Sequence, residues 1–262
     1  MRIGDLVKDS DSLILVSKIL GKDKVWVLSH LDETVGQSES GKILKALRML
    51  RSGVPIQYIL GYKEFMSLRF EVAKGVFIPR YETETLVEKA IEIVKKHGLK
   101  IVADVGTGTG AIGISIAKYT GCRVLATDIS ERAVEIAKRN AEINGVGDIF
   151  EVRLGEYLEP FKSSLEEIEM VVSNPPYVEA GADLPTNVKY EPKEALFAGE
   201  DGLDFFREFF SRYDTTDKYI LMEFSGKRKD ELAEIVGKRV EFLKDLDGVE
   251  RFFLITPSQT DL

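Results

Sequence analysis

The feature that most constrains the fold of this chain is an alternation of short apolar strands and helical segments that begins at residue 100. Such alternation is typical of a parallel sheet covered by helices. Seven runs have the length and composition of strands: 101–105, 123–128, 150–154, 169–173, 219–223, 240–246 and 250–256. The connection around Asp247-Gly248 is so short that the last two strands must pair antiparallel. The sequence therefore predicts an α/β domain whose parallel sheet ends in an antiparallel pair.

The N-terminal part of the chain follows a helical pattern. Apolar residues recur at helical spacing between residues 10 and 53, and Gly21, Gly36 and Ser52-Gly53 interrupt them. We expect a small helical domain over residues 1–54. The pattern leaves open whether this domain recognises a partner or only supports folding.

A different pattern connects this region to the α/β domain. Two alternating, aromatic-rich runs, 57–61 and 68–73, flank a polar stretch. They predict two strands and hence a β-hairpin linker over residues 55–80. The α/β domain then takes up residues 81–262.

Composition excludes several classes of site. The single cysteine, Cys122, rules out an intrachain disulfide and four-thiolate metal sites. The only histidines, His30 and His97, have no partner at metal-ligand spacing, so we expect no metal. Lys and Arg number 36 against 44 Asp and Glu, a net charge of −8, which argues against stable binding of nucleic acid. No apolar run approaches the ~20 residues that cross a bilayer, so we expect a cytoplasmic enzyme.

A glycine-rich turn follows the first strand of the α/β domain. It reads Asp104-Val-Gly-Thr-Gly-Thr-Gly110 and leads into a helix. Glycines let a backbone turn tightly and approach a ligand. The G-x-G-x-G spacing differs from the G-x-G-x-x-G of dinucleotide sites, and no Lys-Ser/Thr pair completes a P-loop. The turn thus predicts a nucleoside cofactor with a charged tail that is not a phosphate. The candidate contacts are Asp104, Gly106, Thr107, Gly108, Thr109 and Gly110.

The ends of the next two strands extend this site. Asp128 ends its strand 24 residues after the first aspartate of the turn, where a carboxylate can accept hydrogen bonds from both ribose hydroxyls. Its alternative role, capping the next helix, suits Ser130 better. Ile129 lies between them as a further candidate contact. Glu156 can accept from an adenine amino group, with Tyr157 beside it for stacking, although exposed acids are common in loops. The set favours S-adenosylmethionine over NAD.

A second motif, Asn174-Pro-Pro-Tyr177, directly follows the fourth strand. This is the sheet edge at which ligands bind in doubly wound folds. The side-chain oxygen of Asn174 and the carbonyl of Pro175 can accept both hydrogens of one NH₂ group. Pro176 stiffens the turn and Tyr177 offers a wall for a planar group. A rigid structural turn is the alternative reading of the tetrapeptide alone.

The chemistry of an amide explains why two acceptors are useful here. The nitrogen lone pair is delocalised into the carbonyl, so the nitrogen is a poor nucleophile. Acceptors placed off the amide plane favour a pyramidal nitrogen, and holding it near a methyl donor supplies the entropic part of catalysis. The motif therefore predicts methyl transfer to an NH₂ group, with Asn174, Pro175 and Tyr177 as the catalytic candidates.

These residues resemble the family of N5-glutamine methyltransferases that modify peptide chain release factors, the PrmC or HemK family. The likeness extends over residues 54–255. Besides the two motifs it includes Gln57-Tyr-Ile-Leu-Gly61, Glu64-Phe65, Phe77-Ile-Pro-Arg80, Glu82-Thr-Glu84, Glu191-Pro-Lys-Glu-Ala-Leu196 and Gly202-Leu203. The resemblance implies a seven-stranded, Rossmann-like class I methyltransferase fold that depends on S-adenosylmethionine, with a small N-terminal helical domain and a hairpin linker.

The resemblance also implies a substrate and particular roles. The substrate is the glutamine of the Gly-Gly-Gln motif in class I release factors. Separately from the resemblance, nothing in the sequence demands more than a monomer, so we expect a monomer. Phe77 is a candidate for packing on adenine, and Arg80 for orienting the linker or the cofactor tail. The chain departs from the family pattern at Tyr81, where proline is usual, and in Glu223–Arg228. The resemblance therefore assigns no role to that last segment.

Three alternatives compete with this interpretation. A sister enzyme could methylate a glutamine of a ribosomal protein by the same chemistry. An amino methyltransferase of DNA or RNA would use similar acceptors but would need to flip a base and hold phosphates, which the acidic charge disfavours. The third alternative is a non-catalytic scaffold that binds the cofactor, and in such a protein the Asn-Pro-Pro-Tyr motif would have no function.

Overall fold

The computed structural model describes residues 1–237 and 240–258, which form two compact units. The helical unit comprises Met1–Gly61 together with Pro185–Tyr190. The sheet unit comprises Tyr62–Leu184 and the described residues from Glu191 onward. Among the described residues, no helix combines the length and the hydrophobicity that a membrane span requires.

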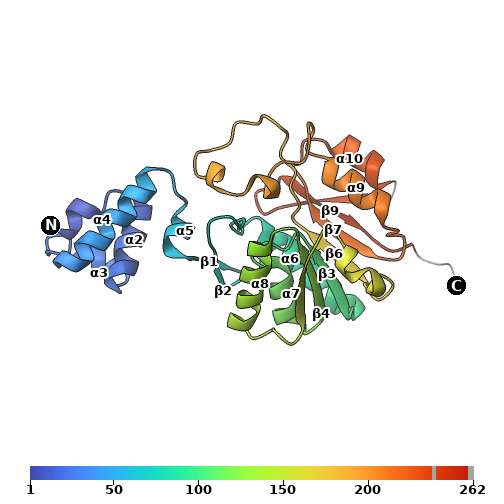
Figure 1. Ribbon diagram of the computed structural model, residues 1–262, viewed down its shortest axis with the longest axis horizontal. Coiled ribbons are helices and arrows are strands. Elements are labelled where there is room, and N and C mark those ends of the chain that lie inside the picture. The colour runs from blue at the N-terminus through green and yellow to red at the C-terminus, as the bar shows by residue number, and fades with distance from the viewer. Residues whose placement is uncertain (238–239, 259–262) are drawn as a thin grey trace. The chain divides into compact units, whose positions relative to one another are not determined.

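The helical unit is built from five helices, two of which begin at a capping aspartate and two of which end at a left-handed glycine. Its helices are α1 (Ile3–Leu6), α2 (Ser10–Leu20), α3 (Lys24–Ser29), α4 (Gln37–Arg51) and α5 (Ile56–Leu60), in blue and cyan in Figure 1. Asp9 caps α2 by accepting from the backbone N–H of Ser12 at 2.8 Å, and Gly21 ends it in the left-handed conformation. Buried apolar residues from α1 to α4 form one core.

A segment from far along the chain also belongs to this unit. Residues 185–190 end in the short 3₁₀ helix η2 (Val188–Tyr190). The hydroxyl of Tyr190 donates to the carbonyl of Ser52 at 2.8 Å, and Thr186 lies against Gly53. The turn between α4 and α5 therefore contacts residues 185–190, which follow the Asn-Pro-Pro-Tyr motif in the sequence.

The prediction of a strand at 57–61 was wrong, because these residues form helix α5. Pro55 precedes the helix and Gly61 ends it with φ at +78°, which are helix boundary signals that outweigh alternation over five residues. The hairpin instead pairs β1 (Tyr62–Phe65) with β2 (Leu68–Glu71). By its contacts α5 belongs to the helical unit, and the hairpin belongs to the sheet unit. The domain limits at residues 54 and 80 stay predictions.

The sheet unit contains one seven-stranded sheet in the order β5-β4-β3-β6-β7-β9-β8. Strands β3 to β7 run parallel, and β9 pairs antiparallel with both β7 and β8. The strands are β3 (Ile101–Val105), β4 (Arg123–Asp128), β5 (Phe150–Leu154), β6 (Met170–Ser173), β7 (Tyr219–Glu223), β8 (Val240–Lys244) and β9 (Glu250–Ile255). The predicted parallel sheet with an antiparallel end is confirmed.

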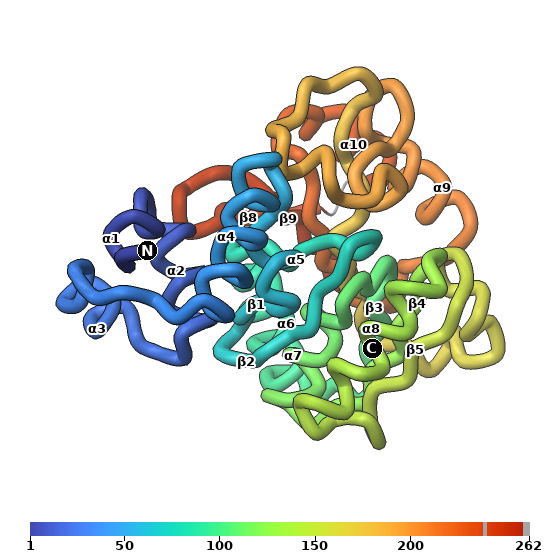
Figure 2. The backbone as a smooth tube through the Cα atoms, turned by 60° about the vertical axis from the view of Figure 1, so that its left-hand side comes forward, coloured from blue at the N-terminus to red at the C-terminus, as the bar shows by residue number. Residues whose placement is uncertain are grey.

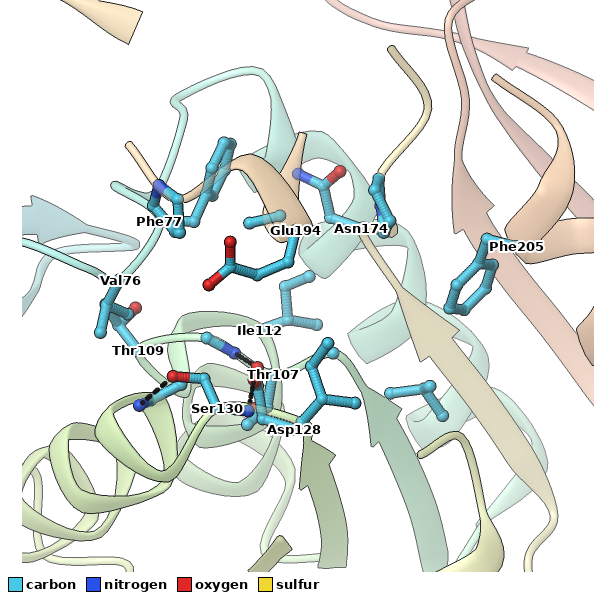
Figure 3. Close-up of a pocket in the computed structure, with 18 of the residues that line it drawn as sticks. Val76, Phe77, Thr107, Thr109, Ile112, Asp128, Ser130, Asn174, Glu194 and Phe205 are labelled. Carbon is cyan, nitrogen blue, oxygen red and sulfur yellow. Dashed lines mark hydrogen bonds between the residues drawn. The ribbon is translucent and has the colours of Figure 1, made fainter. Parts of the chain in front are cut away.

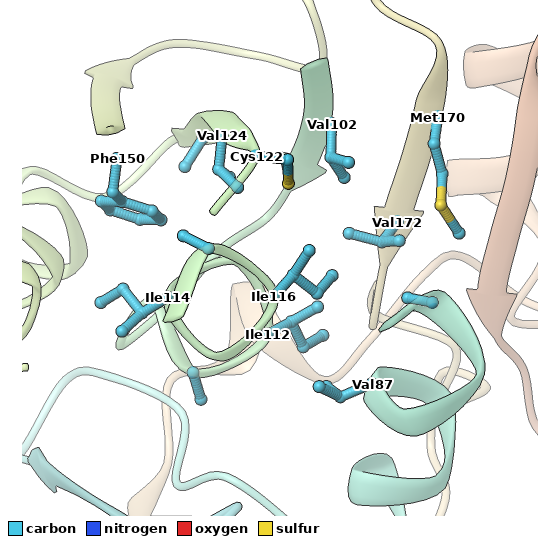
Figure 4. Close-up of a cluster of buried hydrophobic side chains, with 14 of the residues drawn as sticks. Val87, Val102, Ile112, Ile114, Ile116, Cys122, Val124, Phe150, Met170 and Val172 are labelled. Atoms are coloured by element: carbon cyan, nitrogen blue, oxygen red, sulfur yellow. The ribbon is translucent and has the colours of Figure 1, made fainter. Parts of the chain in front are cut away.

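Helices cover both faces of this sheet (Figures 1 and 2). Successive strand residues point to opposite faces. Val102 packs in a cluster with α6, α7 and α8 (Figure 4), and its neighbour Ala103 packs in a cluster with α9 and α10. The helices are α6 (Thr83–His97), α7 (Ala111–Thr120), α8 (Glu131–Ile143), α9 (Asp204–Arg212) and α10 (Lys229–Val236), with the 3₁₀ helices η1 (Glu159–Ser164) and η3 (Lys193–Ala195). Two buried cores thus hold the sheet rigid beneath its carboxyl edge.

Candidate functional site

The strand order creates a crevice at the carboxyl edge of the sheet. The chain runs outward from β3 through β4 to β5 and then returns to β6 on the other side of β3. Loops after β3 and β6 therefore leave in opposite directions, which is the position where open α/β sheets bind ligands. The glycine turn, Asp128 and Asn174 all lie at this edge (Figure 3).

A cavity of about 410 Å³ opens there, a size typical of small-molecule sites. Many of the predicted residues line it: Phe77, Arg80, Gly106, Thr107, Gly108, Thr109, Asp128, Ile129, Glu156, Tyr157, Asn174 and Pro176. Four predicted residues, Asp104, Gly110, Pro175 and Tyr177, are not part of its lining. Which of the lining residues bind a ligand stays a prediction.

The glycine turn owes its shape to backbone angles that only glycine adopts readily. Gly106, Gly108 and Gly110 have φ of +69°, +57° and +83°. The backbone N–H of Thr107 donates to the carbonyl of Thr127 at 2.9 Å. The N–H of Gly108 donates to Asp128 Oδ2 at 2.8 Å. The turn is thereby tied to the end of β4 and wraps the cavity floor.

Asp104 supports the turn from beneath. Its side chain is fully buried, and Oδ2 accepts from Thr107 Oγ1 at 2.5 Å and from the N–H of Gly113 at 2.9 Å. Oδ1 is buried without a partner among the described residues. Burial raises the pKa of Asp104 to about 6. The carboxyl thus fixes the turn and the start of α7 without facing the cavity.

Asp128 faces the cavity with both oxygens already oriented. Oδ1 accepts from the N–H of Ser130 at 2.9 Å, and Oδ2 accepts from the N–H of Gly108. Each oxygen keeps a further lone pair for a ligand hydroxyl. Burial and the nearby charge of Glu194 raise the pKa of Asp128. Ser130 caps α8 by accepting from the N–H of Ala133 at 3.3 Å, as predicted.

Apolar and aromatic groups form the walls of the cavity. Phe77 and Phe205 lie on opposite sides in Figure 3, and Ile129 is 57% exposed at the rim. The ring of Tyr157 packs on Phe205 with centroids 5.2 Å apart. Its backbone has a φ of +48°, which is strained for tyrosine. Strain of this kind is tolerated where the surrounding structure fixes a functional position.

The carboxylate beside this tyrosine is less firmly placed. Glu156 forms an ion pair with Arg212 at 3.4 Å, and both side chains are well exposed. Arg212 also lies over the Tyr157 ring, 4.8 Å from its centroid. The Tyr157 hydroxyl donates to Glu208 Oε2 at 3.2 Å. A ligand that enters this end meets a mixed surface of aromatic rings and acidic oxygens.

The other end of the cavity contains Asn174. Its Nδ2 donates to Thr83 Oγ1 at 3.2 Å. Thr83 in turn donates to Glu223 Oε2 at 2.8 Å, and Tyr177 donates to Glu223 Oε1 at 2.8 Å. Tyr177 therefore turns its hydroxyl into the protein interior. Burial raises the pKa of Glu223 to about 7.

Arg80 lies near this end and joins two distant segments. It forms an ion pair with the buried carboxylate of Glu191, which also accepts from the N–H of Ile78 at 3.1 Å. The guanidinium stacks over the Phe77 ring, 4.6 Å from its centroid. The residues that follow Glu191 are thereby held where Glu194 and Phe197 line the cavity.

Comparison with known proteins decides the family. Residues 7–61 match the family model of the PrmC N-terminal domain, and residues 73–192 match that of the methyltransferase small domain. The release factor glutamine methyltransferase of Clostridium acetobutylicum is 36% identical over 255 residues, 93% of this chain and 90% of the relative. That of Bacillus subtilis is 35% identical over 247 residues, 88% of this chain and 85% of the relative.

The chain belongs to the family of release factor glutamine methyltransferases. This membership confirms the family predicted from the motifs, the enzyme class and S-adenosylmethionine as the methyl donor. Among solved structures, the catalytic domain of hMettl16 in complex with the MAT2A 3'UTR hairpin 6 superimposes with a TM-score of 0.56 at 16% identity, covering 86% of this chain and 83% of that one. That likeness concerns the fold alone, and it agrees with the predicted class I fold.

The cavity of this methyltransferase fits its methyl donor on structural grounds. The donor has an adenine, a ribose with two hydroxyls and a charged methionine tail. The cavity offers aromatic walls, two oriented oxygens at Asp128 and a glycine turn at the N-terminus of α7. These groups all line the same cavity.

Several lining residues of the methyltransferase were not predicted from its sequence. Among them are Thr83, Glu194, Phe205 and Glu208. Glu194 projects into the middle of the cavity between Asn174 and Asp128 (Figure 3). The stretch from 178 to 200 has no helical or strand periodicity, and the only signal for Glu194 was the Glu191–Leu196 segment of the family likeness, which gave it no role. Phe205 and Glu208 look like ordinary members of a helix.

Proposed function

We propose that this protein transfers a methyl group from S-adenosylmethionine to the side-chain amide nitrogen, N5, of the glutamine in the Gly-Gly-Gln motif of class I peptide chain release factors. The observation that carries the proposal is the position of Asn174, which lines the cavity at the end of β6 opposite Asp128 (Figure 3). An acceptor for an NH₂ group thus lies within reach of the cofactor cradle. The names of the relatives, release factor glutamine methyltransferase, support the same reaction.

The cofactor-binding residues follow from the chemistry of the cavity. Asp128 accepts hydrogen bonds from the ribose hydroxyls, and the turn from Gly106 to Gly110 receives the methionine tail. Phe77, Ile129 and Tyr157 enclose the adenine, with Glu156 as an acceptor at its edge. When bound, S-adenosylmethionine supplies a methyl group attached to a sulfonium sulfur. Transfer of the methyl group would release a neutral thioether, which is a good leaving group.

The protein itself positions and orients the glutamine. Asn174 Oδ1 and the carbonyl of Pro175 accept the two amide hydrogens and aim the nitrogen lone pair into the cavity. Pro176 and Tyr177 limit the movement of the amide plane, which supplies effective concentration. The nitrogen becomes strongly acidic after methylation and releases its proton without a dedicated base, so these residues need to bind and orient but not to titrate.

We also propose that the enzyme acts as a monomer in the cytoplasm and binds no nucleic acid stably. The net charge of −8 supports the last point, since phosphate binding needs clustered positive charge.

The test is methyl transfer from labelled S-adenosylmethionine to three purified acceptors. These are a class I release factor, the same factor with the Gly-Gly-Gln glutamine changed to alanine, and total RNA. We expect label on the first acceptor alone, and labelling at least about 100-fold slower when the enzyme carries Asn174→Ala. Label on RNA, or equal label on both forms of the release factor, would refute the proposed substrate.

A further inference from the structure

We infer that Thr83 and Glu223 are positioning residues, which fix the amide of Asn174 so that Oδ1, and not Nδ2, faces the substrate. The inference deepens the proposed function and rests on it. Both residues lie in segments that were compared with the family pattern, Glu82-Thr-Glu84 and Glu223–Arg228, but the resemblance assigns neither of them a role. Thr83 comes from α6 and Glu223 from β7, and Asn174 follows the end of β6.

The three side chains form a continuous chain of hydrogen bonds that runs from the cavity lining at Asn174 and Thr83 to Glu223 in the interior. Glu223 is 1% exposed and Thr83 is 3% exposed, so water does not compete for these bonds. Glu223 Oε2 accepts from Thr83 Oγ1 at 2.8 Å, and Thr83 Oγ1 accepts from Asn174 Nδ2 at 3.2 Å. We call these three side chains the orienting relay.

The direction of the relay follows from counting hydrogens. An ionised carboxylate can only accept, so the hydroxyl of Thr83 must use its single hydrogen toward Glu223. Toward Asn174 that hydroxyl can then only accept. The side chain of Asn174 must therefore turn its NH₂ group to Thr83, which leaves Oδ1 on the opposite side.

Tyr177 also donates a hydrogen bond to Glu223, which keeps this carboxylate an acceptor in the orienting relay. Its hydroxyl donates to Oε1 at 2.8 Å, so both oxygens of the carboxylate receive hydrogens from hydroxyl groups. A proton on Oε1 would still leave Oε2 as the acceptor for Thr83. A carboxylate offers each hydroxyl its own acceptor oxygen, whereas a glutamine at this position would place an NH₂ group against one of them.

The consequence concerns the reaction directly. Among the described residues no donor reaches Asn174 Oδ1, so this acceptor is available to the cavity that Asn174 lines. An asparagine amide without the relay can rotate by half a turn and present its NH₂ group to the NH₂ group of glutamine. Two donors then face each other, and one of the two acceptors that orient the substrate is lost.

Thr83 allows a matched pair of variants. Thr83→Ser keeps the hydroxyl, whereas Thr83→Val keeps the shape and removes it. At about pH 8.5, where the carboxylate of Glu223 is ionised, we expect Thr83→Ser to keep kcat for the release factor within about threefold. We expect Thr83→Val to lower kcat about tenfold or more, the effect of one lost hydrogen bond, with the Kd for S-adenosylhomocysteine unchanged.

A double variant tests whether the residues act as a unit. Adding Glu223→Gln to Thr83→Val should lower kcat little further, because the relay is already broken. Equal kcat for Thr83→Val and Thr83→Ser, or independent effects of the two changes, would overturn the inference. Thermal melting of each variant excludes a general loss of fold.

A measurement without catalysis separates this inference from the proposed function. The side-chain NH₂ signal of Asn174 can be assigned by NMR from its absence in Asn174→Ala. Its hydrogen exchange should be slow in the unaltered enzyme and in Thr83→Ser, and at least about tenfold faster in Thr83→Val. Equal exchange in all three would refute the relay. A release factor left unlabelled by the unaltered enzyme would instead refute the proposed function.

Discussion

Replacement of Asp128 by asparagine is a sharp test of how the cofactor is held. The two oxygens of Asp128 accept from the N–H groups of Gly108 and Ser130 at 2.8 and 2.9 Å. An asparagine offers one oxygen and one NH₂ group, so one of these backbone donors must face another donor. The ribose also loses a charged acceptor.

The size of the effect follows from these lost bonds. A hydrogen bond to a charged group contributes about 1.5–3 kcal/mol, and about 1.4 kcal/mol corresponds to a tenfold change in affinity. Losing one such bond to ribose should therefore raise the Kd for S-adenosylhomocysteine about 10- to 150-fold. Isothermal titration calorimetry measures it directly. The matched control is Glu135→Gln, which removes an exposed carboxylate that is paired to Arg132 and does not line the cavity, and it should change the Kd less than about twofold.

The outcomes differ clearly. A Kd for Asp128→Asn within about threefold of the unaltered enzyme would refute the role of Asp128 in holding the ribose. A large loss of kcat with an unchanged Kd would also refute it, since it would place Asp128 at the transfer end.

Three further predictions concern the transfer end, the glycine turn and the buried carboxyls. Asn174→Ala should lower kcat at least about 100-fold, because the asparagine binds the substrate amide. The Kd for the cofactor should stay within about twofold. An equally large loss of cofactor affinity, measured by calorimetry, would contradict this assignment. Gly108→Ala should cost about 1–2 kcal/mol of stability because φ is +57° and should weaken cofactor binding. Its control, Gly121→Ala, has φ of +74° at the end of α7 and should cost similar stability with the same Kd; equal binding by both variants would argue against the turn as the cradle. Asp104 has a pKa of about 6 in the folded protein, above its ordinary 3.8, because of burial. Its contribution therefore favours folding below about pH 4 and is lost as the pH rises through about 6. Urea unfolding measures how far the free energy of unfolding falls from pH 5 to pH 8. That fall should be smaller by about 1–2 kcal/mol in Asp104→Asn than in the unaltered enzyme. An equal fall in both proteins would show that Asp104 does not cause this pH dependence.

Much of the sheet unit could be predicted because its signals are local. The strand at 101–105 is a short buried run that a glycine turn ends, and Ser130 marks the start of α8. Asp128 and Asn174 could be placed at the site because they follow directly from the ends of parallel strands, which meet at one edge.

The residues that escaped prediction act over long sequence separations. Thr83 and Glu223 are 140 positions apart and meet only because α6 and β7 pack side by side. Glu194 lies in a stretch without periodicity. Tyr177 was predicted as a wall for a planar group, and the sequence did not indicate that its hydroxyl donates to Glu223. Residues 57–61 show the opposite failure, since five residues cannot distinguish a short strand from a short helix.

The assignment of residues 185–190 to the helical unit limits what truncation can reveal. A chain that starts at Tyr62 lacks Ser52, so the hydroxyl of Tyr190 loses its acceptor and Thr186 loses its neighbour Gly53. These residues lie only a few positions after the Asn-Pro-Pro-Tyr motif and directly before Glu191. Loss of activity on removing residues 1–61 would therefore not distinguish a partner-recognition domain from one that holds an active-site loop in place. Point changes at Tyr190, which leave the N-terminal helices intact, separate the two.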